Sequence, residues 1–239
     1  MKINNNKWDK IIDSKKSKFI FNLYEIIQYK DLIKFFIKRD FVVFYKQTIL
    51  GPLWYVIQPL VNTIVFTVIF GNLAKIPTDG NPPFLFYLSG TVIWSYFAIC
   101  LTTTSRTFLT NAHIFGKVYF PRVSVPLSNV IFSLVQFFLQ FIIFLFFYIY
   151  FFTNGTSLNF NINLLIILPL LLLQTAFLGL GFGLLISSLT TKYRDLNFVM
   201  DFFVQLWMFA TPIVYPLSLV PDNYKLIIAI NPMTSVVET

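Results

Sequence analysis

The sequence predicts an all-α integral membrane protein, because it carries little charge, contains one long neutral stretch and places its basic residues unevenly. Of 239 residues, 56% are hydrophobic and 12% are charged, whereas a soluble domain carries about 25% charged residues. The 69 residues between Arg122 and Lys192 include no Asp, Glu, Lys, Arg or His. A transmembrane helix needs about 20 mostly apolar residues, so this stretch alone can cross a bilayer twice. Of the 18 basic residues, 11 precede Gly51.

Uncharged windows between charged residues predict five transmembrane helices. The long neutral stretch divides at residues 153–163, where Asn, Gly and Ser are typical of a turn. The predicted spans are 53–70, 84–104, 125–152, 164–189 and 197–214. Two later apolar pieces, 217–220 and 226–230, are too short to cross, and we expect them to be re-entrant or interfacial. Five spans leave Thr239 on the outer side, so we expect a sixth span to be missing.

The basic residues also predict the orientation, because Lys and Arg concentrate in cytoplasmic connections. With the N-terminus inside, 16 of the 18 basic residues fall on the cytoplasmic side, and only Lys75 and Lys225 fall outside. We therefore expect a multi-pass protein of the bacterial cytoplasmic (inner) membrane with a cytoplasmic N-terminus. Anionic lipid headgroups explain this positive charge better than nucleic acid does, because the charge lies beside the membrane.

Residues 23–41 predict an amphipathic helix ahead of the first span. Its polar face would hold Gln28, Asp31, Lys34 and Lys38, and its apolar face Ile26, Ile33, Phe36 and Ile37. A helix of this kind lies in the membrane interface. We therefore expect two parts: residues 1–46 form a cytoplasmic arm with the interfacial helix, and residues 47–239 form a transmembrane domain that is incomplete at its C-terminus.

The sequence lacks the common motifs of an enzyme. It has no GxxxxGK[ST] loop for ATP, and its single histidine, His113, and single cysteine, Cys100, exclude a metal site built from several such residues. Gly179, Gly181 and Gly183 lie in a GLGFG stretch inside a predicted span, where small residues are typical of close helix packing. We expect no catalytic residue, cofactor or metal in this chain.

Several short stretches together carry a family resemblance. They read RDFVVFYKQTILGPLWYVIQP at 39–59, NAHIFGKVYFPR at 111–122, TTKYRDL at 190–196, TPIVYP at 211–216 and NPMT at 231–234. In this order and spacing the chain resembles the permease subunits of type-2 ABC exporters, in the polysaccharide-export branch that handles O-antigen, capsule or teichoic acid chains. The resemblance implies six spans, two paired copies of the permease, and a separate ABC ATPase subunit that binds ATP and magnesium.

The resemblance also implies roles for cytoplasmic residues. A coupling helix in the first cytoplasmic loop would dock on the ATPase through Asn111, Ile114, Phe115, Lys117, Phe120 and Pro121. Apolar residues on such a loop need a cover, which lipid could also provide. The helix at 23–41 would brace the ATPase at the membrane surface. Arg39, Tyr193, Arg194 and Asp195 would form a cytoplasmic gate or transmit ATPase motion, although Arg194 could simply mark the topology.

Aromatic residues and one charged residue within a predicted span remain as candidates for the transport path, although the charged residue could simply lie near the interface with access to water. Trp54, Tyr55, Trp94, Tyr96 and Phe97 could stack on sugar rings, or they could belong to the aromatic belt at the membrane edges. Asp201 lies inside the fifth predicted span, and a charge at the centre of a span costs about 2.5–3.5 kcal/mol. We therefore expect Asp201 to face the helix bundle or water.

The function predicted from these features is that of a permease subunit in an ATP-driven exporter of lipid-linked polysaccharide. Its partners would be the ATPase, a second copy of itself, the lipid-linked polysaccharide and membrane lipids, with no nucleic acid. Two alternatives stay open: a type-2 ABC exporter of drugs or lipids, and a membrane-embedded transferase acting on lipid-linked sugars. The transferase would need a carboxylate cluster or a catalytic base, and neither is found in the sequence.

Overall fold

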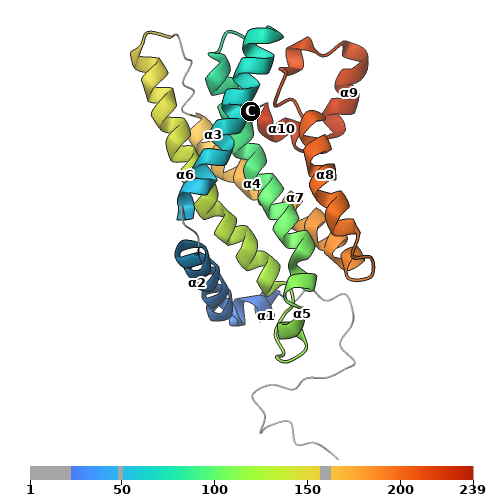
Figure 1. Cartoon of the computed structure of the whole chain (residues 1–239). Helices are drawn as coiled ribbons and strands as arrows, with labels where there is room; N and C mark the ends of the chain where they lie inside the picture. Colours follow the sequence, from blue (N-terminus) through green and yellow to red (C-terminus); the bar gives the residue numbers. More distant parts are fainter. Residues whose placement is uncertain (1–22, 48–50, 157–162, 239) are drawn as a thin grey trace, which may run out of the picture.

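The computed structural model describes residues 23–47, 51–156 and 163–238, and within these ranges all regular secondary structure is helical. The predicted arm before residue 23 and most of the turn at 153–163 lie outside the described residues. In chain order (Figure 1) the elements are α1 (Leu23–Gln28), α2 (Lys30–Gln47), η2 (Gly51–Leu53), α3 (Trp54–Phe66), η3 (Thr67–Leu73), α4 (Pro83–Thr110), α5 (Ala112–Phe115), α6 (Ser124–Thr153), α7 (Asn163–Thr190), α8 (Leu196–Phe209), η4 (Leu217–Leu219), α9 (Asp222–Ile230) and α10 (Thr234–Val237).

Four helices in the described part of the chain are long and apolar enough to cross a membrane. They cover Trp54–Leu73, Pro83–Thr110, Ser124–Thr153 and Ile166–Thr190. These helices confirm the first four predicted spans and the all-α membrane class. The second span extends to Thr110, six residues beyond its predicted end, and therefore contains Arg106.

The fifth predicted span is shorter than expected. It was predicted to run to residue 214, but α8 ends at Phe209 after 14 residues. Pro212 and Pro216 follow, and proline cannot continue a helix because it lacks the backbone N–H and clashes with the preceding turn. At 1.5 Å per residue α8 is about 21 Å long, less than the roughly 30 Å hydrocarbon core. The short pieces beyond it fold as η4, α9 and α10 at the end of the molecule opposite α2 and α5 (Figure 1).

Helix α4 is the central helix of the bundle. In its most apolar stretch 61% of residues are buried, against 17–28% in the other three spanning helices. One apolar cluster joins α4 to α8 and the segments after it, through Trp94, Phe97, Val204 and Ile213. A second joins α4 to α6 through Tyr96 and Phe137. The other helices are therefore arranged around α4.

Helices α4 and α7 approach each other most closely at two glycines. A Cβ atom added to Gly179 would lie 2.6 Å from the Cβ of Cys100, and one added to Gly183 would lie 2.5 Å from the Cβ of Thr104. Both distances are far below van der Waals contact, so only glycine fits at this crossing. Gly181 has no such neighbour within 4 Å. The close packing predicted for the GLGFG stretch is confirmed at Gly179 and Gly183 but not at Gly181.

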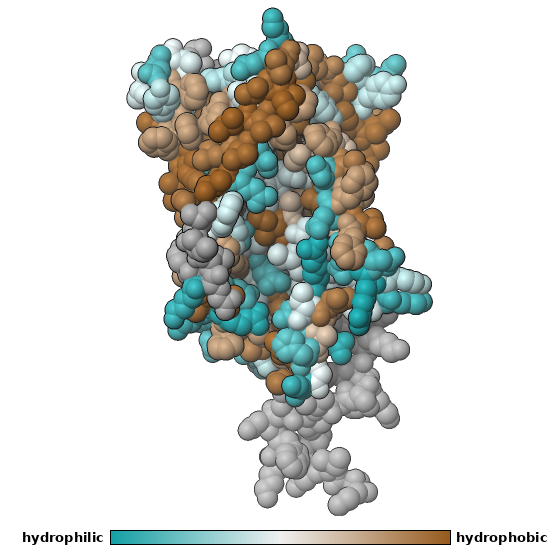
Figure 2. All heavy atoms as spheres, viewed as in Figure 1, coloured by the Kyte–Doolittle hydropathy of each residue, from teal (hydrophilic) through white to brown (hydrophobic). Residues whose placement is uncertain are grey.

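Helix α2 is amphipathic, but its apolar side packs on the protein. Ile33 and Phe36 are 7% and 3% exposed, and Phe36 packs with Phe120 and Val125 at the start of α6. The predicted polar residues Gln28, Asp31, Lys34 and Lys38 are all exposed. Figure 2 shows apolar surface over most of the upper part of the molecule and polar surface at the end that holds α1, α2 and α5.

Candidate functional site

The connection between α4 and α6 forms an aromatic cluster with α2. The ring centroids of Phe36 and Phe120 are 5.9 Å apart, those of Phe115 and Phe120 are 5.5 Å apart, and those of Phe108 and Phe115 are 5.6 Å apart. Phe120 is only 6% exposed. The predicted ATPase contact Phe120 therefore lies under α2, and Phe115 is half-buried beside it.

A different part of the same loop is open to solvent. Val118 is 60% exposed and Tyr119 is 53% exposed, and His113 and Lys117 are exposed beside them. The Tyr119 hydroxyl donates a hydrogen bond of 3.3 Å to the Glu25 carboxylate of α1. Val118 and Tyr119 could not be singled out from the sequence, because an exposed apolar pair next to a buried aromatic residue has the same sequence pattern as a buried pair.

The remaining predicted coupling residues shape the loop. The Asn111 side-chain amide donates to the carbonyl of Thr107 at 3.1 Å and satisfies the C-terminal end of α4. Ile114 packs in the same apolar cluster as Phe36, and Pro121 is half-buried before α6. These residues hold the loop in place, and Lys117 alone of the predicted set is exposed there.

The four predicted gate residues fall into two separate groups. Arg39 lies on α2, where its guanidinium pairs with Asp40 at 2.8 Å and lies 4.9 Å from the centre of the Phe36 ring. Tyr193, Arg194 and Asp195 are all exposed in the turn between α7 and α8. Within the described residues no hydrogen bond or ion pair joins Arg39 to this turn.

An ion pair that the sequence did not predict joins α4 to α8. The Arg106 guanidinium donates to the Asp201 carboxylate at 2.6 Å, and to the backbone carbonyl of Asn197 at 3.3 Å. The side chains of Arg106 and Asp201 are 38% and 62% exposed. Asp201 thus has a partner in the bundle, as expected. Because 95 residues separate the two charges, no local pattern could reveal the pair.

Polar side chains are exposed along three of the membrane helices. Gln58 and Asn62 are exposed one turn apart on α3, Thr103 on α4, and Asp201 and Gln205 one turn apart on α8. Away from their ends, the exposed side chains of α6 and α7 are apolar. In the view of Figure 2, pale and teal surface runs down the middle of the face on which α4 and α8 lie toward the viewer, and brown surface flanks it. This arrangement can hold water beside α3, α4 and α8.

Most of the aromatic residues predicted to line a path are in the core instead. Trp94, Tyr96 and Phe97 are at most 5% exposed, because α4 is covered on its sides by α6, α7 and α8. Trp94 and Phe97 pack on Trp207, and Tyr96 packs on Phe137. This placement does not fit contact with a sugar. Of the other two, Trp54 is 51% exposed, and Tyr55 is half-buried with its ring stacked 4.1 Å from that of Phe44.

Asn231 links the NPMT and TPIVYP stretches through hydrogen bonds of its side chain. Its side-chain oxygen accepts hydrogen bonds from the Trp207 indole N–H at 3.0 Å and from the Met233 backbone N–H at 3.1 Å. Its amide nitrogen donates to the Thr211 hydroxyl at 2.9 Å. These hydrogen bonds join the NPMT stretch to the end of α8 and to the TPIVYP stretch, and so they position the segments that follow α8.

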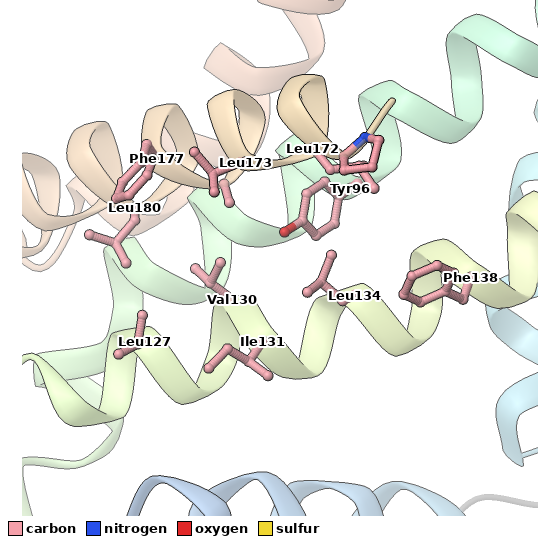
Figure 3. A pocket seen from close by; sticks show the side chains of 12 residues that line it. Tyr96, Leu127, Val130, Ile131, Leu134, Phe138, Leu172, Leu173, Phe177 and Leu180 are labelled. Carbon is pink, nitrogen blue, oxygen red and sulfur yellow. The ribbon is translucent and has the colours of Figure 1, made fainter. Parts of the chain in front are cut away.

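A crevice of about 370 Å³ separates α6 from α7. Figure 3 shows Val130, Leu134 and Phe138 facing Leu173 and Phe177 across it, with the Tyr96 hydroxyl between the two helices. Its lining is apolar apart from that hydroxyl. The described residues also hold no group of three His, Cys, Asp or Glu that could bind a metal. The crevice itself therefore offers neither an acid–base pair nor a set of metal ligands.

Comparison with known proteins decides the family. The model of the ABC-2 type transporter family matches residues 31–239. The chain belongs to this family. It is similar to two proteins of Klebsiella pneumoniae named O-antigen export system permease protein RfbA, 29% and 27% identical over 207 residues, which cover 87% of this chain and 77% of each relative. It is also similar to the protein of that name from Myxococcus xanthus, 26% identical over 213 residues, 88% of this chain and 79% of the relative.

Membership of the ABC-2 type transporter family confirms the resemblance seen in the sequence. The relatives are named permease proteins, which are components of transporters rather than catalysts. The family also implies an ATPase partner.

Proposed function

We propose that this chain is the membrane permease subunit of an ATP-driven exporter that moves a lipid-linked polysaccharide across the bacterial cytoplasmic membrane. The names of the relatives support the cargo class. The observation that carries the transport role is the line of exposed polar side chains on α3, α4 and α8. Unpaired polar groups are costly in hydrocarbon, so this surface needs water or another protein beside it.

A second copy of the chain supplies the other wall of the path. One protomer leaves Gln58, Asn62 and Gln205 exposed on its surface rather than inside a closed channel. Two copies that face each other through α3 and α8 enclose these amides and shield them from lipid. Amide and hydroxyl side chains can donate to and accept from the hydroxyl groups of a passing sugar chain.

The ATPase docks on the cytoplasmic loop between α4 and α6. The exposed Val118 and Tyr119 offer an apolar contact, with Lys117 beside them. Motion of this loop passes to α2 through the packing of Phe115, Phe120 and Phe36, so α2 braces the ATPase indirectly. ATP and magnesium bind to the ATPase, and the N-terminus of the permease lies in the cytoplasm.

Deletion of the gene tests the proposal. We expect the polysaccharide to accumulate inside the cell on its lipid carrier and to disappear from the surface. Expression of the wild-type chain should restore surface polysaccharide, but only when the partner ATPase retains its catalytic residues. Unchanged surface polysaccharide in the deletion strain would refute the cargo class, and a change in drug sensitivity or lipid distribution alone would favour the alternative exporters.

A further inference from the structure

Arg106 and Asp201 are the only charged residues within α3, α4, α6, α7 and α8. They pair with each other at 2.6 Å. Charged residues inside membrane helices are rare and face protein or water, and they commonly mark sites of function. These two charges come together from separate helices, so the pair is a polar contact between α4 and α8 in addition to the apolar packing of Trp94 and Phe97 on Trp207.

The pair lies close to both cytoplasmic turns. Arg106 is four residues before the end of α4, which passes through Asn111 directly into the loop proposed to bind the ATPase. Asp201 is six residues after Asp195, the last residue of the exposed turn ahead of α8. At 1.5 Å per residue both charges lie within about 10 Å of those turns. A movement of either turn therefore reaches the ion pair through a short, continuous helix.

The Arg106–Asp201 ion pair is exposed to solvent, so it can break and form again. At 38% and 62% side-chain exposure on a polar surface, it resembles the exposed ion pairs that contribute little to stability in water. Around it, α8 contributes only Met200 and Val204 to the buried core, and most of its other residues are exposed. The contact between the cytoplasmic halves of α4 and α8 thus depends on few interactions.

Arg106 also has a second acceptor within reach. Asn197 precedes Asp201 by one helical turn, and its backbone carbonyl already accepts from the guanidinium at 3.3 Å. The side-chain oxygen of Asn197 is buried and has no hydrogen-bond partner in the described part of the chain. A guanidinium carries five donors, so Arg106 can leave Asp201 and remain satisfied at Asn197.

We propose that Arg106 and Asp201 form a latch between α4 and α8 that opens and closes during each transport cycle, with Asn197 as the alternative partner of Arg106. Both are positioning residues, and the proposal rests on the proposed function of the chain as an exporter subunit. The closed latch holds the cytoplasmic ends of the two helices together. Its opening lets α8 move when the ATPase pulls on the cytoplasmic turns.

A reversible cross-link tests the latch. The Arg106→Cys/Asp201→Cys variant, assembled with its ATPase in membranes, is linked with a reducible bis-methanethiosulfonate reagent. The single variants Arg106→Cys and Asp201→Cys are the controls, and the native Cys100 is fully buried. We expect export by the linked double variant to fall in proportion to the linked fraction and to return on reduction, while the reagent does not change the export measured for each single-cysteine control before treatment. Full export by the linked protein would overturn the proposal. It would show that α4 and α8 do not have to separate at this point during transport.

Charge reversal keeps the proposal testable if the cysteine variants are inactive. We expect Arg106→Asp and Asp201→Arg each to lose export, and the double variant Arg106→Asp/Asp201→Arg to recover most of it. A double variant no better than either single variant would overturn the latch. Export of polysaccharide by the wild-type protein, measured in the same experiment, separates the two proposals. If the wild type exports no polysaccharide, the proposed function is rejected. If the wild type exports polysaccharide and the cross-linked protein does so equally well, only the latch is rejected.

Discussion

The close crossing of α4 and α7 predicts that the same substitution, glycine to alanine, has very different effects on stability at Gly181 and at Gly183, two residues apart. Gly183→Ala places a Cβ atom 2.5 Å from the Cβ and 2.7 Å from the Cγ2 of Thr104, and 3.2 Å from the backbone oxygen of Leu101. The Cβ of Thr104 is fixed to the backbone of α4, so the helices must move apart. Gly181→Ala, on the same helix, meets nothing within 4 Å.

The difference between these two variants isolates the packing cost. Gly→Ala within a helix stabilises by about 0.5–1 kcal/mol through backbone entropy, and this gain is shared by both variants. Overpacking typically costs about 1–3 kcal/mol. We therefore expect Gly183→Ala to be about 1–3 kcal/mol less stable than Gly181→Ala.

Thermal unfolding in detergent, followed by size-exclusion chromatography of the heated samples, measures the difference. Gly183→Ala should lose its monodisperse peak at a clearly lower temperature than Gly181→Ala, and wild type should lie between them. Equal melting temperatures for the two variants would refute the close approach of α4 and α7 at this point.

Two further predictions concern the loop between α4 and α6 and the segments that follow α8. Tyr119→Asp and Val118→Asp should each release the ATPase in a pull-down while the permease stays folded, because they remove exposed apolar contact; retained binding would reject this docking surface. Asn231→Leu should lower stability by about 1–3 kcal/mol, because the indole N–H of Trp207 loses its acceptor. Asn223 is exposed, so Asn223→Leu is the matched control. Equal melting temperatures for these two variants would argue against a stabilising role for the hydrogen bonds of Asn231.

The sequence predicted those features that follow from local composition. Neutral stretches located the first four spans, and the glycines at 179 and 183 indicated close packing, because both depend on a few neighbouring residues. The end of the fifth span was misplaced because hydropathy continues past Phe209 while the helix does not. Trp94 could not be assigned to the core, because an aromatic residue in a span looks the same whether lipid, water or another helix covers it.

The candidate site was only partly predictable for a related reason. The loop at 111–121 was recognised by its motif, but which of its residues are buried depends on the position of α2, whose Phe36 lies 84 residues before Phe120. The pairing of Arg106 with Asp201 depends on the relative placement of α4 and α8, and nothing near either residue encodes it. Long-range contacts of this kind required the structure.

Transport by the purified proteins tests the central claim most directly. The permease and its ATPase are reconstituted in sealed vesicles with a lipid-linked polysaccharide added to the leaflet on the ATPase side, and the accessibility of the glycan to an added glycosidase is followed. We predict that ATP makes the glycan inaccessible from that side, and that a catalytically inactive ATPase abolishes the change. Glycan that stays fully accessible with active ATPase and ATP would contradict the account.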